Sequence, residues 1–418
     1  MSMSDRNRLL AEMTDEVAGL VLRNNYLQTL AISLAARRGM ADFDFQARFM
    51  RDLEARGLLD RAVEVLPDDG ELAEREKEGR PLTRPELAVL LAYAKITLYD
   101  ELRGAAIADD PYLSRELMRY FPPTLQQRVP ADIEAHQLRR EIIATVLANS
   151  MINRGGPVFV DRIADQTGAD APQVAAAFAA VRDSFGVTEL NGRIDALDNQ
   201  IPGAVQLELY GAVQDLLLDQ TVWFLRNADF SDGIAAVAER HREGVEILVS
   251  HLDRVLPERA NERRRAAAQR WADKGVEEGL ALHVASLGAL SMAPDVVLVA
   301  RESGHPVAEV ALVYFALAGY FETDGITGLA RELEVPDYFD RLALSRGLEQ
   351  MAAAQRQLVM NVLAHGSSGA EGLESWVNQR RDKLDRARRA LKEIADDGAL
   401  TLSKLAVAAS LLGDLVRM

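Results

Sequence analysis

The stretch LTRPELAVLLAYAKITLYDEL at residues 82–102 decides the fold class. Its apolar side chains return every three or four residues, which is the spacing of one face of an α-helix. The members of this stripe are Leu87, Leu90, Leu91, Ala94 and Leu98. The residues TRPE at 83–86 have the spacing of a capping box, and Pro85 is tolerated in a first helical turn. We therefore expect a long helix with one buried face.

The same periodicity continues along the chain. A second apolar stripe consists of Val205, Leu209, Val213, Leu216, Leu217 and Phe224. Asp110 before Pro111 indicates a further helix start, and so does Asp170 with Gln173 three residues later.

The remaining apolar segments also favour helices. The run VALVYFALAGYF at 310–321 is too short to span a membrane and is predicted to be a core helix. Strand-like alternation is almost missing, and short pieces such as 158–160 are the candidates. The sequence therefore predicts an all-α protein, a multi-helix bundle.

Breaks in the pattern divide the chain. They fall at 67–81, 227–233, 365–372 and 396–398. The first of them, PDDGELAEREKEGRP, is expected to be a charged and solvated connector. We expect three regions, an N-terminal helical region at 1–130 and two helical units at 131–256 and 257–418.

A faint internal repeat supports the idea of two similar helical units. The stretch at 160–185 resembles that at 297–321, and pairing Gly168 with Gly304 gives an offset of 136 residues (304 minus 168). The same offset pairs Gly211 with Gly347. Alanine and valine are common enough to match by chance, but glycine falls on glycine twice, so we predict a duplicated helical unit.

Composition excludes several classes of function. The 418 residues carry 48 Lys and Arg against 64 Asp and Glu, a net charge of −16, which argues against nucleic-acid and anionic-membrane partners. Cysteine is absent, so disulfides, thiolate nucleophiles and sulfur-ligated metals are excluded. This composition fits a cytoplasmic location. The start MSMSDRNRLL lacks the apolar region of a secretory signal; if Met1–Ser4 is an added sequence, the natural polypeptide extends upstream.

Motifs for catalysis and cofactor binding are missing from the sequence. Neither a G-x-G-x-x-G nor a P-loop pattern occurs, and nothing indicates the βαβ units of a dinucleotide-binding fold. No two histidines have the spacing of a helical metal site. His241 and His251, near Glu243 and Glu246, are expected on a solvated helix face. We assign no catalytic, cofactor-binding or metal-binding residue to this chain.

Four segments have both a functional and a structural interpretation. The helix HQLRREIIATVLANSMINR at 136–154 carries Arg139, Arg140 and Arg154, which favour either an anion site or inter-helix hydrogen bonding, and the second is the commoner. The basic runs at 261–270 and 379–392 are expected to be solvated helix faces rather than nucleic-acid sites. The helix–turn–helix pattern at 160–185 has an alanine-rich second helix, so packing is expected there.

Four stretches of the chain are long and distinctive: VLRNNYLQTLAIS (21–33), LTRPELAVLLAYAKITLYDEL (82–102), DDPYLSRELMRYFPPTL (109–125) and HQLRREIIATVLANSMINRGG (136–156). Together they resemble the C-terminal region of the large bacterial NAD-specific glutamate dehydrogenases. The resemblance implies an enzyme that converts L-glutamate to 2-oxoglutarate and ammonia with NAD, whose substrate lysines and nucleotide-binding fold lie upstream. Lys95 lacks the glycine-rich context of the family's substrate lysine, so no catalytic role is carried over to it.

The resemblance implies that this chain is an accessory region for assembly or regulation. Its expected partners are the upstream catalytic domain of the same polypeptide and further copies in a homo-oligomer; NAD is the cofactor of the parent enzyme and is not expected to bind this segment. The alternative is a self-standing helical scaffold for protein interactions without catalytic activity.

The first helix carries a heptad seam. Its members are Leu10, Met13, Val17, Leu20, Asn24, Leu27, Ala31 and Leu34. We expect this seam to pack along another long helix; an ordinary amphipathic helix with a break at Asn24–Asn25 is the alternative. By the resemblance, this helix is the first element after the catalytic domain.

Overall fold

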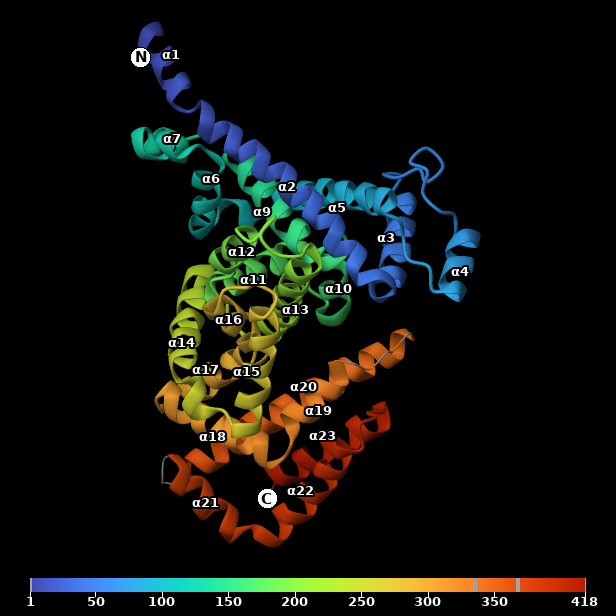
Figure 1. The fold of residues 1–418 in the computed structure, drawn as a ribbon, viewed down its shortest axis with the longest axis vertical. Coiled ribbons are helices and arrows are strands. Elements are labelled where there is room, and N and C mark those ends of the chain that lie inside the picture. Colours follow the sequence, from blue (N-terminus) through green and yellow to red (C-terminus); the bar gives the residue numbers. More distant parts are fainter. Residues whose placement is uncertain (1, 332, 334, 336, 366–368, 418) are drawn as a thin grey trace. The chain divides into compact units, whose positions relative to one another are not determined.

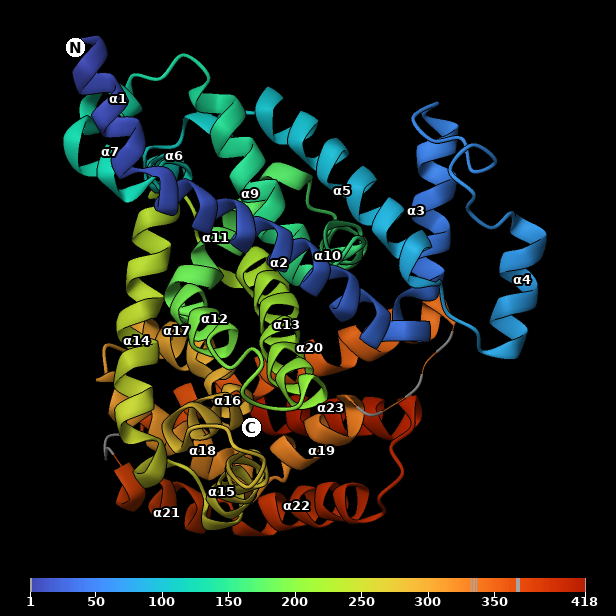
Figure 2. The same ribbon diagram turned by 45° about the horizontal axis from the view of Figure 1, so that its top comes forward.

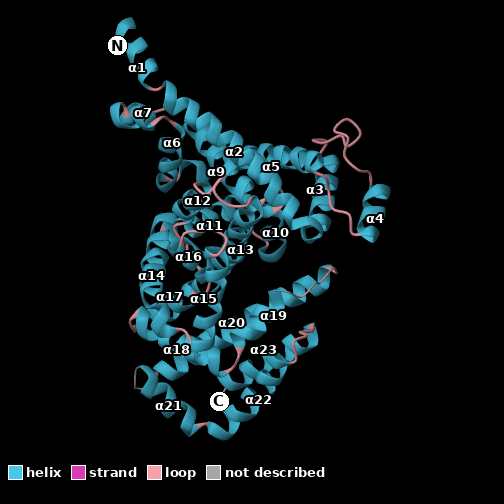
Figure 3. Cartoon of the chain, viewed as in Figure 1, coloured by secondary structure: helices cyan, strands magenta, loops and turns pink. Residues whose placement is uncertain are grey.

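A computed structural model describes residues 2–331, 333, 335, 337–365 and 369–417. Throughout these residues the regular elements are helices, and Figure 3 shows no strand among them. The predicted all-α class is confirmed. The short strand considered at 158–160 is wrong: Phe159 begins a helix, and Val158 and Phe159 are buried by helix packing.

Contacts divide the chain into two compact units. The first comprises Met1–Asp183 and Val187–Val237, and the second comprises Ser184–Gly186 and Ala238–Met418. The three regions expected from the sequence have other boundaries, since 131–256 extends past Val237, and they stay a prediction.

The first unit is built around long helices (Figure 1). Its elements are α1 (Met3–Glu12), α2 (Thr14–Arg38), η1 (Gly39–Asp42), α3 (Phe43–Ala55), α4 (Asp69–Glu78), α5 (Arg84–Gly104), η2 (Ala106–Asp109), η3 (Pro111–Leu113), α6 (Ser114–Tyr120), α7 (Pro123–Arg128), α8 (Pro130–Glu134), α9 (Arg139–Gly155), α10 (Phe159–Thr167), α11 (Ala171–Ser184), α12 (Val187–Asp195) and α13 (Gly203–Asn227). Helix α5 packs along α9, and α2 contacts α5, α9 and α13 (Figure 2).

The two predicted apolar stripes are buried in this unit. All five stripe residues of α5 and all six of α13 lie in its core. Helix α5 begins after Thr83 with the predicted capping box, in which the Thr83 amide donates to the Glu86 carboxylate at 2.6 Å. Asp170 and Gln173 exchange side-chain-to-amide hydrogen bonds of 2.9 Å at the start of α11. These helix starts are therefore confirmed.

The prediction of a solvated connector at 67–81 is wrong for the middle of this segment, where helix α4 forms. Asp68 caps this helix by accepting from the amide of Glu71 at 2.8 Å, and Gly79 ends it in the left-handed conformation. Arg75 is buried and donates two bonds of 2.9 Å to Glu86. A charged segment is thus held as a helix by an ion pair to α5.

The second unit contains the remaining helices. They are α14 (Gly233–Val255), α15 (Glu258–Ala272), α16 (Glu278–Leu290), α17 (Ala293–Ser303), α18 (Val307–Tyr320), α19 (Thr323–Arg331), α20 (Tyr338–Leu363), α21 (Gly369–Gln379), α22 (Arg381–Asp396) and α23 (Leu402–Val416). Helix α20 packs along α23, and α15 packs along α16. The apolar run at 310–321 lies in and just after α18, which is buried as predicted. The predicted break at 365–372 lies partly outside the described residues.

In the described part of the chain, no single helix has the length and apolar character needed to cross a membrane. Helices α16 and α17 meet that test as a pair bent by 53°. Both contribute buried residues to the core of the second unit.

Helix bounds recur at the offset of 136 residues. Shifted by that offset, α11 coincides with α18 and α12 with α19 at both ends. Gly168 and Gly304 end α10 and α17 in the same left-handed conformation, with φ of 73° and 72°. The next turn repeats as well, because Gly186 has φ of 59° and its counterpart Glu322 has φ of 54°. This agreement supports the predicted duplication at the level of helix order, while the similarity of packing stays a prediction.

Candidate functional site

A buried carboxylate joins four helices of the first unit. Asp195 ends α12, and its side chain is 11% exposed. Arg154 of α9 lies 3.2 Å from one carboxylate oxygen, and Arg23 of α2 lies 3.3 Å from the other. Tyr210 of α13 donates a short hydrogen bond to the same group. We call these residues, with Tyr26 and Gln206, the Asp195 network.

Two more side chains extend the Asp195 network toward α2. The hydroxyls of Tyr26 and Tyr210 lie 3.3 Å apart, and Gln206 donates to the Tyr26 hydroxyl at 3.3 Å and to the carbonyl of Ile194 at 2.8 Å. Burial, followed by the hydrogen bond to Asp195, raises the pKa of Tyr210 far above its usual range. The phenol therefore stays protonated and acts as a fixed donor, which suits a structural tie.

A second charged cluster holds the end of α2. Asp42 is fully buried and accepts from Arg38 at 2.9 Å and, through a short ion pair, from Arg162 of α10. Burial lowers the pKa of Arg162 despite the attraction of Asp42. The positive charges of Arg38 and Arg162 compensate the carboxylate of Asp42, because an unpaired buried carboxylate destabilises the fold.

A third cluster connects α6 with α11. Glu116 and Arg182 are both buried and pair at 2.7 Å. Beside them, Asp183 accepts from Tyr112 and from Arg115, each at 3.0 Å. Burial favours a higher pKa for Asp183, but the hydrogen bond and charge of Arg182 outweigh it and hold the pKa of Asp183 below its usual range. This carboxylate is thus kept ionised by its neighbours.

The arginines of α9 bind protein groups. Arg139 donates to the hydroxyl of Ser114 at 2.9 Å, and Arg140 donates to Asp109 at 2.9 Å and to the carbonyl of Ala105 at 3.0 Å. Arg154 belongs to the Asp195 network. Of the two interpretations of this helix, the hydrogen bonds favour inter-helix bonding, since each arginine already has an internal acceptor.

Two sequence expectations about solvated charges need correction. His241 is 4% exposed, so it does not lie on a solvated face, whereas Glu243 and Glu246 beside it are exposed. Within the basic run at 261–270, Arg264 is buried and donates to Ser286 at 3.1 Å. Among the described residues, no group of three or more histidines and carboxylates is placed to hold a metal ion.

Helix α11 lies in the core, in agreement with the packing interpretation of the helix–turn–helix pattern. Its apolar residues from Val174 to Val181, except the partly exposed Ala176, are almost completely buried. Lys95 is half-buried on α5, and burial lowers its pKa.

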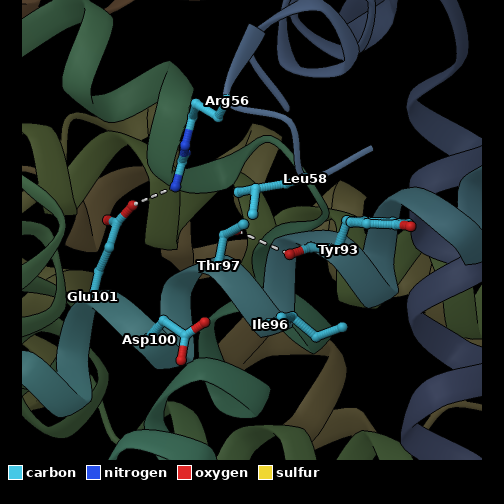
Figure 4. Close-up of a pocket in the computed structure, with 7 residues that line it drawn as sticks. All are labelled: Arg56, Leu58, Tyr93, Ile96, Thr97, Asp100 and Glu101. Carbon is cyan, nitrogen blue, oxygen red and sulfur yellow. Dashed lines mark hydrogen bonds and ion pairs between the residues drawn. The ribbon is translucent and has the colours of Figure 1, made fainter. Parts of the chain in front are cut away.

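A pocket of about 350 Å³ opens between the end of α3 and α5 (Figure 4). Its wall includes Leu58, Tyr93 and Ile96, and its polar groups are engaged with the protein: Arg56 lies 3.8 Å from Glu101, and Thr97 donates to the carbonyl of Tyr93 at 2.9 Å. Such a pocket offers an apolar surface for binding rather than free polar groups for catalysis.

The sequence could not reveal which residues pair in the Asp195 network. Arg154 was singled out as a polar residue on α9, but Arg23, Tyr26, Asp195, Gln206 and Tyr210 were missed. Arg23 is 172 positions from Asp195 in the sequence (195 minus 23), so no local spacing links them. One weak signal is present in the sequence, since Gln206 and Tyr210 directly follow Val205 and Leu209, two residues of the apolar stripe of α13.

The class defined so far is an all-helical protein whose buried charges tie helices together. Residues 79–414 match the family model of the glutamate dehydrogenase C-terminal region, and residues 1–35 match that of the catalytic domain of bacterial NAD-glutamate dehydrogenase. Because the first match covers most of the chain, this chain belongs to the glutamate dehydrogenase C-terminal family.

The relatives that this chain matches over almost its whole length are much longer proteins. The chain is 35% identical to an NAD-specific glutamate dehydrogenase of Pseudomonas aeruginosa, aligned over 100% of the chain and 26% of the relative. The values are 34%, 99% and 26% for a protein of the same name from Halomonas elongata, and 30%, 97% and 25% for one from Mycobacterium tuberculosis. The chain thus spans about a quarter of the length of these relatives.

Proposed function

We propose that this chain is the C-terminal helical region of a cytoplasmic, NAD-dependent glutamate dehydrogenase that converts L-glutamate to 2-oxoglutarate and ammonia. The chemistry lies upstream of this chain, and NAD binds there. The observation that carries this proposal is that the C-terminal family model matches residues 79–414, whereas residues 1–35 match the catalytic domain.

The Asp195 network supports a role in joining the two parts. Arg23 and Tyr26 lie in the stretch that matches the catalytic domain, whereas Asp195, Gln206 and Tyr210 lie in the stretch that matches the C-terminal region. Helix α2 thereby ties catalytic-domain sequence to α9, α12 and α13. In this proposal the chain positions the catalytic domain and contributes to assembly of a homo-oligomer.

The test of the activity compares two proteins. The full-length polypeptide that carries this chain is expected to form NADH from L-glutamate and NAD, and the 418-residue chain alone is expected to form none. NADH formation by the chain alone would overturn the accessory role. A full-length polypeptide without this activity would favour the alternative, a helical interaction scaffold.

The joining role has a separate test in the full-length polypeptide. Arg23→Gln with Tyr26→Phe removes the guanidinium and the hydroxyl through which α2 contacts the rest of the Asp195 network. We expect a lower thermal midpoint and reduced turnover, with an unchanged affinity for NAD. As a matched control, Arg8→Gln removes an exposed pair to Asp5. It is expected to change neither quantity, because exposed pairs contribute little.

A further inference from the structure

Several apolar side chains of α1 and α2 are exposed. Leu10, Val17 and Val21 are 53%, 44% and 55% exposed. Met13 and Leu34, on the inward face, are buried against the rest of the first unit. The predicted seam is therefore divided. Met13, Ala31 and Leu34 are buried and Leu20 and Leu27 are half-buried, whereas Leu10, Val17 and Asn24 are exposed.

The three open residues form one stripe. At about 100° per residue, Leu10, Val17 and Val21 fall within roughly 40° of one another around the helix axis. The helical path continues across the bend at Met13, since the Met13 amide donates to Leu9 at 3.1 Å and the Val17 amide donates to Met13 at 2.9 Å. The break considered at Asn24–Asn25 is wrong, because α2 is continuous there.

This stripe lies in the part of the chain that matches the catalytic domain, residues 1–35. About three quarters of the length of the relatives lies outside the matched region. A domain has its own core, and a helix that belongs to it buries an apolar stripe there. The inward stripe of α2 is used by the C-terminal region, so the outward stripe is left for the catalytic domain.

We propose that Leu10, Val17 and Val21 form the surface on which the catalytic domain of the same polypeptide docks. This inference rests on the proposed function for the identity of its occupant. Covalent linkage gives that occupant a high effective concentration at the stripe, which a free partner lacks. Helix α2 is then shared, with one face in each part of the enzyme.

Cysteine labelling tests the surface without disturbing the fold. The chain contains no cysteine, so Leu10→Cys, Val17→Cys and Val21→Cys each introduce a single thiol at an exposed position. Leu22→Cys is the matched control, because Leu22 is 68% exposed and lies about 100° away around the same helix. Labelling by a maleimide is followed at each site by peptide mass mapping, in the 418-residue chain and in the full-length polypeptide.

In the chain alone, we expect all four thiols to react at similar rates. In the full-length polypeptide, the three stripe thiols should react at least tenfold more slowly, and the Leu22→Cys thiol should keep its rate. Equal reactivity of the stripe in both proteins would overturn the proposal, and so would equal protection of Leu22→Cys. Protection that appears in the chain alone and grows with its concentration would assign the stripe to a second copy and also overturn it.

These outcomes are separate from those of the activity test. A full-length polypeptide that oxidises glutamate but leaves the stripe reactive would contradict the docking surface and keep the function. A polypeptide that protects the stripe but forms no NADH would contradict the function and keep the docking surface.

Discussion

Glu116 and Arg182 are buried charges that depend on each other. Their side chains are 2% and 4% exposed and lie 2.7 Å apart. Arg182→Met removes the cation and leaves Glu116 with the partly exposed Arg119 at 3.3 Å. We expect the free energy of unfolding to fall by about 3 kcal/mol, because breaking a buried pair leaves a buried carboxylate without its buried partner. Urea unfolding measures this change.

The double variant provides the control for that prediction. Arg182→Met with Glu116→Leu removes both charges, and replacing a whole buried pair by apolar residues is often neutral. Part of the lost stability should therefore return, while the loss of Arg182 beside Asp183 remains in both variants. A double variant as unstable as Arg182→Met alone would show that packing, rather than charge, causes the loss.

The phenol of Tyr112 should lose its proton at a higher pH than a free tyrosine does. Burial, and then the charge of Asp183, raises the pKa of Tyr112 to about 12, against about 10 for a free tyrosine. Because the folded-state pKa is the higher one, its contribution to stability is complete below about pH 10 and is lost as the pH rises toward 12. The difference in tyrosinate absorbance between the wild type and Tyr112→Phe gives the titration of this phenol. A difference curve centred near pH 10 would contradict the expected shift.

At the scale of elements, Glu86 connects the start of α5 to α4. It accepts from the Thr83 amide at 2.6 Å and from both terminal nitrogens of Arg75 at 2.9 Å. Glu86→Ala removes a cap and leaves Arg75 buried, and we expect a loss of about 3 kcal/mol in urea unfolding. Glu71→Ala is the control, since Glu71 also pairs with Arg75 but is 47% exposed. It should cost less than about 1 kcal/mol, and equal losses for the two variants would contradict a special role of Glu86.

Helices could be predicted from the sequence because periodicity and capping are local. The stripes of α5 and α13 and the starts of α5 and α11 needed no knowledge of the fold. Helix α4 was missed because its residues are charged, and its stability depends on the pair between Arg75 and Glu86 across a turn. The Asp195 network was missed for the same reason at longer range, since packing alone brings Arg23 to Asp195.

At the scale of the whole molecule, the predicted duplication implies that corresponding helices pack on one another in the same way. Helix α10 packs on α13 and α17 packs on α20, while α12 packs on α13 and α19 on α20. In an experimentally determined structure, residues 159–227 should therefore superpose on 295–363 with all four helices running in the same directions. Helices of a pair that point in different directions would show that the matching bounds arose by coincidence.

A repeated glycine extends this prediction to stability. A Cβ on Gly211 of α13 would overlap with the guanidinium of Arg37 on α2, and a Cβ on Gly347 of α20, which is 136 residues further on, would lie 2.8 Å from Leu405 on α23. Each of these glycines thus admits the close approach of another helix. Gly347→Ala should destabilise by roughly 1–3 kcal/mol, because the buried Leu405 must move. Gly211→Ala should cost much less, since the end of the exposed Arg37 swings into solvent.

Gly413→Ala, with open space at its Cβ, should stabilise by up to about 1 kcal/mol through helix propensity alone. Thermal and urea unfolding of the three variants test this order, and a Gly347→Ala variant as stable as Gly413→Ala would contradict the close approach of α23.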